Sequence, residues 1–140
     1  MADKYASFAE LKASEPEGSY RIEVRLSGTV VALIAPHAGK IEPGTSEICR
    51  SVASSDLTYY LFEGRKSSNN RELHITSSRF DEPQAIDLAH SAQVVVTFHG
   101  QIGEDQFVNV GGLAEPSSTA MIDALNAVGF SASRHSVELH

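Results

Sequence analysis

The chain has 140 residues, 41% of them hydrophobic, and a formal net charge of −7 with neutral histidines. This length is sufficient for one domain with a hydrophobic core, and the composition is that of an ordinary globular protein. The acidic excess argues against general nucleic-acid binding, and no hydrophobic stretch approaches the roughly 20 residues of a membrane span, so we expect neither nucleic acid nor membrane as a partner.

Hydrophobic periodicity predicts helices and strands that alternate along the chain. In chain order, the pattern predicts a helix over 5–15, strands over 20–26 and 29–35, a helix over 45–55, a strand over 57–64, a polar loop over 65–72, a short strand over 73–78, a helix over 82–92, strands over 93–100 and 106–112, a helix over 118–130 and a last strand over 136–140. This order favours a three-layer α/β fold, in which a mixed, largely parallel β-sheet is flanked by helices. No repeat or linker divides the sequence, so we expect a single domain over 1–140.

Two of the predicted strands are hydrophobic throughout, and both end in a histidine. The run "VVALIAPHAG" ends at His37, and "QVVVTFHG" ends at His99. Ligand sites of open α/β sheets lie beyond the carboxyl ends of the strands, so we expect the two histidines to lie close together, with Glu42 in the loop after the first. Two imidazoles and a carboxylate can hold zinc with a fourth position open. A histidine after a strand is also commonly a hydrogen-bonded loop residue, and the pattern alone leaves both interpretations open.

Five stretches, taken in order, resemble a known family. They are "APHAGKIEPGTSEI", "LFEGRK", "NRELHITSSRFDEP", "VVVTFHG" and "VNVGGL". Together they resemble the phage and bacterial poly-γ-glutamate hydrolases, which are similar in fold to zinc carboxypeptidases. The resemblance implies a zinc-dependent hydrolase that cleaves the γ-glutamyl amide bonds of poly-γ-glutamate, a bacterial capsule polymer. It implies Zn²⁺ as cofactor and His37, Glu42 and His99 as its ligands, with Ala38 where the family commonly has glycine.

The resemblance weakens after "NAVGF". The family continues into a strand whose glutamate resembles the carboxypeptidase general base, whereas this sequence ends in "SRHSVELH". Glu138 comes too early to match that strand, so the catalytic base is expected beyond His140 and is assigned to no residue of this chain. We therefore expect weak activity from the 140-residue form, and self-association through an exposed edge of the sheet.

Substrate carboxylates need cationic and amide partners. Residues 37–79 carry six basic and five acidic side chains, a net charge of +1, which leaves −8 for the rest of the chain. Arginine suits a bidentate grip on a carboxylate. The expected substrate contacts are Lys40, Arg65, Asn70, Arg71 and His74. Glu63 is expected as an outer partner of a ligating imidazole.

Two other functions remain open on the sequence. One is a zinc amidase that acts on another acidic acyl-amino substrate, and the other is a non-catalytic, metal-stabilised module that binds polyanions. The first residues lack the hydrophobic core of a signal peptide, so we expect cytoplasmic synthesis, with action outside the cell after host lysis if the protein is phage-derived.

Overall fold

The computed structural model describes residues 2–135. The chain divides into two compact units, Met1–Gln101 and Ile102–His140. The single domain expected from the sequence stays a prediction. None of the described helices combines the length and the hydrophobicity that a membrane span requires.

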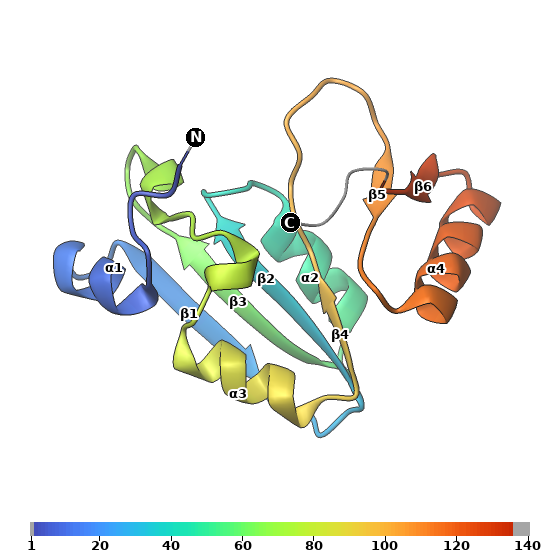
Figure 1. The fold of residues 1–140 in the computed structure, drawn as a ribbon, viewed down its shortest axis with the longest axis horizontal. Coiled ribbons are helices and arrows are strands. Elements are labelled where there is room, and N and C mark those ends of the chain that lie inside the picture. The colour runs from blue at the N-terminus through green and yellow to red at the C-terminus, as the bar shows by residue number, and fades with distance from the viewer. Residues whose placement is uncertain (1, 136–140) are drawn as a thin grey trace. The chain divides into compact units, whose positions relative to one another are not determined.

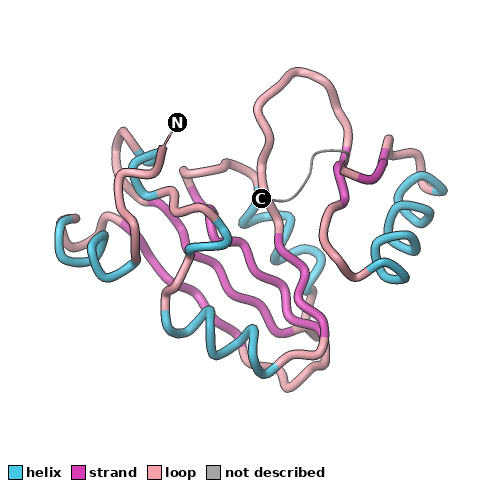
Figure 2. The backbone as a smooth tube through the Cα atoms, viewed as in Figure 1, coloured by secondary structure: helices cyan, strands magenta, loops and turns pink. Residues whose placement is uncertain are grey.

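The first unit is built on a four-stranded sheet with the order β1-β3-β2-β4 (Figures 1 and 2). The strands are β1 (Tyr20–Arg25), β2 (Val31–Gly39), β3 (Thr58–Gly64) and β4 (Val94–Thr97). Strand β2 pairs parallel with both β3 and β4, and only β1 is antiparallel to its neighbour β3. This confirms the predicted mixed, largely parallel sheet.

Helices cover both faces of this sheet, which makes three layers (Figure 1). Helices α1 (Phe8–Ser14) and α3 (Pro83–Ser91) lie on one face, and α2 (Thr45–Ala53) lies on the other. The three helices predicted in this unit therefore form, and each is somewhat shorter than predicted.

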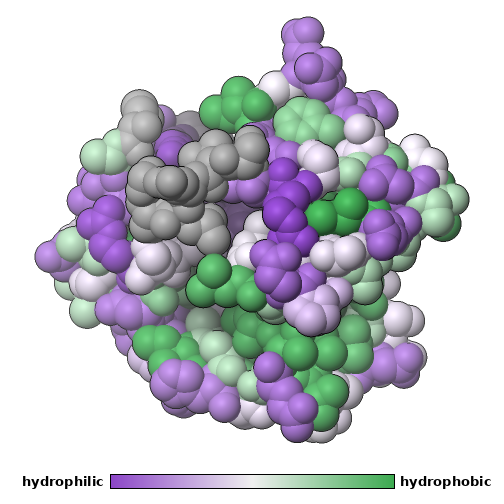
Figure 3. Space-filling view, turned by 45° about the vertical axis from the view of Figure 1, so that its right-hand side comes forward, coloured by the Kyte–Doolittle hydropathy of each residue, from purple (hydrophilic) through white to green (hydrophobic). Residues whose placement is uncertain are grey.

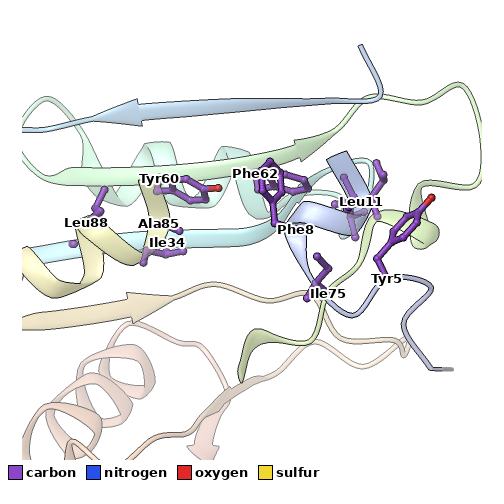
Figure 4. Packing of buried hydrophobic residues seen from close by; sticks show 12 residues of the cluster. Tyr5, Phe8, Leu11, Ile34, Tyr60, Phe62, Ile75, Ala85 and Leu88 are labelled. Carbon is purple, nitrogen blue, oxygen red and sulfur yellow. The ribbon is translucent and has the colours of Figure 1, made fainter. Parts of the chain in front are cut away.

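The larger hydrophobic cluster lies between the sheet and helices α1 and α3. Figure 4 shows Phe8 and Leu11 of α1 near Phe62 and Ile75, and Leu88 of α3 near Tyr60. The smaller cluster, on the other face, joins the sheet to α2 through Leu33, Ala35, Ala38, Cys49, Ala53 and Leu61. Strand β2 contributes to both clusters, which explains why its sequence is hydrophobic without alternation.

A bulge interrupts the regular alternation of β2 just before its end. The register against β3 shifts between Ala35 and Ala38. Both alanines belong to the α2 cluster although they are three positions apart, which strict alternation forbids. The bulge therefore turns His37 to the other face, where its ring contacts the backbone of Ile75.

The strand predicted over 73–78 does not form. The segment instead contains two 3-10 helices, η1 (Asn70–Leu73) and η2 (Ser77–Arg79). Leu73 and Ile75 alternate and are fully buried, as in a strand, but no neighbouring strand pairs with them among the described residues. The backbone N–H of Thr76 is donated to the Asp3 carboxylate instead. The hydrophobic pattern thus predicted burial correctly and the backbone conformation wrongly.

In the second unit, β5 (Val108–Val110) pairs parallel with β6 (Ala132–Arg134), and α4 (Glu115–Ala127) connects them. The Asn126 side chain closes the turn after α4 by bonding both the N–H and the carbonyl of Ala132. The strand predicted over 136–140 lies outside the described residues.

Strand β4 is an edge of the described sheet. Its side chains are only partly buried, and Val95 is 40% exposed. Figure 3 shows other hydrophobic side chains at the surface among hydrophilic ones. Self-association through the sheet edge stays a prediction.

Candidate metal-binding site

His37 enters the site from the bulge of β2 with its ring already oriented. The side chain is 2% exposed, and its Nε2 lies 2.6 Å from the carbonyl oxygen of Ile75. A carbonyl can only accept, so Nε2 carries the proton, and in a neutral ring the lone pair is then on Nδ1. This backbone contact is the usual way in which a metal-ligating histidine is held in one tautomer.

Glu42 lies in the turn between β2 and α2, opposite the Nδ1 of His37. The turn is closed by the Glu42 N–H, which donates to the His37 carbonyl at 2.8 Å. One carboxylate oxygen, Oε1, lies 3.3 Å from His37 Nδ1 and accepts the N–H of Gly100 at 3.0 Å. Burial opposes ionisation of this carboxyl group, but His37 and His99, when their facing nitrogens carry a proton, together with the Gly100 N–H outweigh it and lower the pKa of Glu42 well below its ordinary value. Glu42 is thus an anion at neutral pH.

His99 reaches the same point from the other strand. The Phe98 N–H donates to the Ile34 carbonyl at 2.9 Å and extends the pairing of β4 with β2 up to the histidine. His99 Nδ1 lies 3.3 Å from His37 Nδ1 and 3.7 Å from Glu42 Oε1. Its Nε2 lies 3.2 Å from the Ser77 hydroxyl. The side chain of His99 is 37% exposed, so this side of the cluster is open to solvent.

Gly100 allows the two strand ends to approach closely. A Cβ at this position would lie 3.1 Å from the Cβ of Glu42, closer than side chains normally pack. The glycine of the His-Gly pair thus lets its backbone N–H reach the Glu42 carboxylate.

The donor set of this cluster suits a zinc ion. One atom from each of His37, Glu42 and His99 lies within 4.8 Å of the other two. Two imidazole nitrogens and an anionic oxygen that face each other repel unless a proton or a cation lies between them, and zinc accepts this combination of ligands. The structure therefore brings together the three residues that the sequence predicted as ligands.

His74, expected as a substrate contact, lies directly behind the cluster. Its ring stacks on that of His37 with the ring centroids 3.9 Å apart, and its Nε2 lies 3.9 Å from Glu42 Oε2. Its Nδ1 lies 2.9 Å from the Asp3 carboxylate. Burial is the main reason why the pKa of His74 is lowered, although Asp3 acts in the opposite direction, so the ring is neutral at neutral pH and donates its Nδ1–H to Asp3.

Two of the expected substrate residues, Lys40 and Arg65, line a cavity of about 400 Å³ at the ends of β2 and β3. Arg21 and Arg50 also line it, and the sequence reading missed both. Arg50 is neutralised by Glu23 and Glu63, whereas the Lys40 ammonium contacts only a backbone carbonyl, that of Lys66, among the described residues. The cavity is thus cationic in a protein that is acidic as a whole.

The remaining two expected substrate residues lie on η1. Asn70 is buried, and its amide donates to the Lys66 carbonyl and accepts the Lys66 N–H. Its side chain therefore closes the loop before η1. Arg71 is exposed, and its charge contributes to the lowered pKa of His74.

The expectation for Glu63 is wrong. Its carboxylate accepts the Ser46 hydroxyl at 2.7 Å and pairs with Arg50 at 3.3 Å, and it is bonded to none of the histidines that the structure describes. The physical reason is that Glu63 faces the α2 side of the sheet, whereas the bulge turns His37 to the opposite side.

The sequence reading also missed the residues that support the cluster. The Ile75 contact is made by a backbone carbonyl and has no side-chain signature, and Asp3 lies far from the motifs in sequence. Ser77 belongs to the "NRELHITSSRFDEP" stretch, but its contact with His99 was not predicted from the sequence. Glu138, which comes too early in the sequence to match the general base of the family, lies outside the described residues.

Comparison with known proteins identifies a family to which the chain is similar. The model of the poly-gamma-glutamate hydrolase family matches residues 5–140. Among curated proteins, the UPF0714 protein YndL of Bacillus subtilis (strain 168) is 40% identical over 130 residues, which are 93% of this chain and 51% of that protein. The SPbeta prophage-derived UPF0714 protein YoqZ of the same organism is 41% identical over 131 residues, which are 94% of this chain and 47% of that protein. The chain thus spans about half the length of these curated relatives.

Two solved structures share the fold. One, described as zinc-free apo YndL, has a TM-score of 0.94 and 38% identity, and the match covers 99% of this chain and 68% of the other. The other, described as a bacteriophage poly-gamma-glutamate hydrolase, has a TM-score of 0.94 and 33% identity with the same coverage.

Proposed function

The chain belongs to the poly-γ-glutamate hydrolase family, and from that premise we propose that it is a zinc-dependent hydrolase that cleaves the γ-glutamyl amide bonds of poly-γ-glutamate. The observation that carries the proposal is the convergence of His37, Glu42 and His99 at the ends of two parallel strands. One related structure is described as zinc-free and another as a poly-gamma-glutamate hydrolase, and both descriptions support the proposal.

We assign the metal to His37 Nδ1, His99 Nδ1 and a Glu42 carboxylate oxygen. When bound there, zinc would polarise the amide carbonyl and lower the pKa of a water molecule. The backbone of Ile75 keeps the lone pair of His37 directed into the site, and the N–H of Gly100 holds Glu42. The exposed side of His99 leaves an approach for a polymer from solvent.

The cationic cavity supports the choice of an acidic substrate. Poly-γ-glutamate carries a free carboxylate on each residue, and a protein with a net charge of −7 can bind it only through local positive charge. Lys40 lies in the turn between the end of β2, which carries His37, and Glu42, and Arg65 lines the same cavity. We propose that these two side chains hold substrate carboxylates, with Arg71 as a more distant contact.

We assign the general base to no residue of 2–135. The carboxylates nearest the cluster are already used: Glu42 is a proposed ligand, and Asp3 accepts hydrogen bonds from His74 and Thr76. The glutamate that the family resemblance implies as general base is matched by none of the described residues. The role outside the cell after host lysis also stays a prediction.

The test is loss of polymer length with the zinc-loaded chain, followed by gel permeation, with His37→Ala as the inactive control. Shortening of poly-γ-glutamate by the wild-type chain, absent in the control, is the expected result. Cleavage of other acyl-glutamates without any effect on the polymer would favour the amidase alternative. Zinc and polymer binding without cleavage would favour the non-catalytic module.

A further inference from the structure

We propose that Asp3 is a positioning residue of the metal-binding site, which fixes the segment 74–76 whose backbone orients His37. The inference rests on the metal role proposed above. Asp3 touches none of the three proposed ligands, and its effect passes through His74, Ile75 and Thr76.

The Asp3 carboxylate uses both oxygens to hold this segment. Oδ1 lies 2.9 Å from His74 Nδ1, and Oδ2 accepts the N–H of Thr76 at 2.6 Å and its hydroxyl at 2.8 Å. The Asp3 side chain is only 5% exposed. Burial opposes its ionisation, but the hydrogen bonds from Thr76 and His74 outweigh it and lower the pKa of Asp3 to about 2. An anion is thus kept in place by three donors.

The segment held by Asp3 touches His37 at two points. The Ile75 carbonyl, between the two residues that Asp3 bonds, accepts the Nε2–H of His37 at 2.6 Å. The His74 ring stacks on His37 with an interplanar angle of 26°. No strand pairs with 74–76 in the described part of the chain, so a sheet ladder does not fix the Ile75 carbonyl. The Asp3 contacts on either side of it take that role.

Asp3 is itself firmly anchored, although it lies near the start of the sequence. Tyr5, Phe8 and Leu11, which follow it, are buried in the larger cluster beside Ile75 (Figure 4). The Phe8 N–H also donates to Asp81 at 2.7 Å. A second link between the same segments is the ion pair of Lys4 with Glu72, which is exposed and does not touch 74–76. This pair provides a matched control.

The first measurement is the affinity for Zn²⁺ alone, by competition with a chromophoric chelator, in the 140-residue chain. Loss of an outer partner of a metal ligand typically costs 10–100-fold in affinity, and we expect a loss of about tenfold in Asp3→Ala. Lys4→Ala should stay within about twofold of the wild type. Wild-type affinity in Asp3→Ala, or an equal loss in Lys4→Ala, would overturn the proposal.

Asp3→Asn covers the case in which Asp3→Ala does not fold. Asparagine has the shape of aspartate but a single acceptor oxygen, so it cannot serve both His74 and Thr76. It should weaken Zn²⁺ binding in the same direction, and wild-type affinity in this variant would contradict the proposal. The visible absorption of the Co²⁺-loaded protein should also change in shape, which loss of stability alone does not cause.

The second measurement needs no metal. Long-range ¹H–¹⁵N spectra of the histidine side chains report which ring nitrogen carries the proton. The wild type should show His74 protonated at Nδ1 and His37 at Nε2, with slow exchange of the His37 proton. In Asp3→Asn or Asp3→Ala, the His37 proton should exchange faster, and an unchanged His37 signal would refute the inference. If the wild type bound no zinc, the proposed function would fail, and this measurement would still decide the role of Asp3.

Discussion

The Nδ1 atoms of His37 and His99 lie 3.3 Å apart, although 62 residues separate them in the sequence. His37 lies near the end of β2 and His99 follows β4 by two residues, and the two strands pair directly in parallel, so the sheet itself sets their proximity. In neutral His37, the Nε2–H donates to the Ile75 carbonyl, so the lone pair is on Nδ1 and faces His99. A cation between the rings would stabilise this arrangement.

From this geometry, we expect His37→Ala and His99→Ala each to weaken Zn²⁺ binding by more than about 100-fold. Loss of a residue that only supports a metal ligand costs up to about 100-fold in affinity, and loss of the ligand itself should cost more. His90→Ala is the matched control, because His90 lies exposed on α3. The measurement is metal content after zinc loading and dialysis, with chelator competition for the affinity. Equal zinc retention by His37→Ala and the control would show that the cluster is not the metal site.

We expect Lys40→Ala and Arg65→Ala each to weaken binding of poly-γ-glutamate about two- to fivefold, since exposed ion pairs contribute about 0.2–1 kcal/mol. Added salt should weaken wild-type binding and reduce the difference between wild type and variants. Binding is measured by fluorescence anisotropy of labelled polymer on zinc-free protein, so that the polymer is not cleaved. Lys12→Ala, an exposed lysine of α1 outside the cavity, is the control. Affinities that do not respond to salt or to either substitution would exclude the cavity as the polymer site.

Ser46→Ala should lower the free energy of unfolding by about 1–3 kcal/mol. The Ser46 side chain is 1% exposed, accepts the Gly39 N–H at 2.9 Å and donates to Glu63 at 2.7 Å. Its loss leaves a buried N–H and a carboxylate without this partner, next to the loop that carries Glu42. Urea unfolding of zinc-free protein is the measurement, with Ser51→Ala on the exposed side of α2 as control, expected within about 0.5 kcal/mol of the wild type. A Ser46→Ala variant as stable as this control would contradict the expectation.

The lowered pKa of Asp3 predicts that the free energy of unfolding falls as the solution becomes acidic. Its pKa is lowered from 3.8 to about 2 in the folded chain, so the unfolded chain takes up the proton first as the pH falls. The stabilisation by Asp3 is therefore complete above about pH 4 and is lost as the pH falls toward about 2. Glu42, with its lowered pKa, acts in the same direction. Urea unfolding of wild type and Asp3→Asn at several values between about pH 5 and pH 2.5 isolates Asp3, because Glu42 is present in both. The wild-type stability should fall more steeply, and two parallel curves would disprove the contribution.

The sequence by itself determined the layered sheet and the convergence of His37, Glu42 and His99. The hydrophobic run of β2 predicts a central strand because burial on both faces leaves no room for polar residues. The carboxyl ends of parallel strands meet at one edge of a sheet, so His37 and His99 could be placed together without any structure. Both inferences depend on local patterns and on a general rule of sheet topology.

Only the tertiary structure decided how the cluster is held. Alternation along β2 is a local rule, but the bulge that overrides it depends on pairing with β3. The sequence pattern therefore could not show which face of the sheet His37 occupies, and for the same reason the role expected for Glu63 was wrong. The Ile75 carbonyl carries no side-chain signature, and Asp3 meets His74 across 71 positions of sequence. Such contacts depend on where the chain folds back on itself. A hydrogen bond requires a donor and an acceptor at a short distance, and a local sequence pattern can indicate one of these groups but not its distant partner.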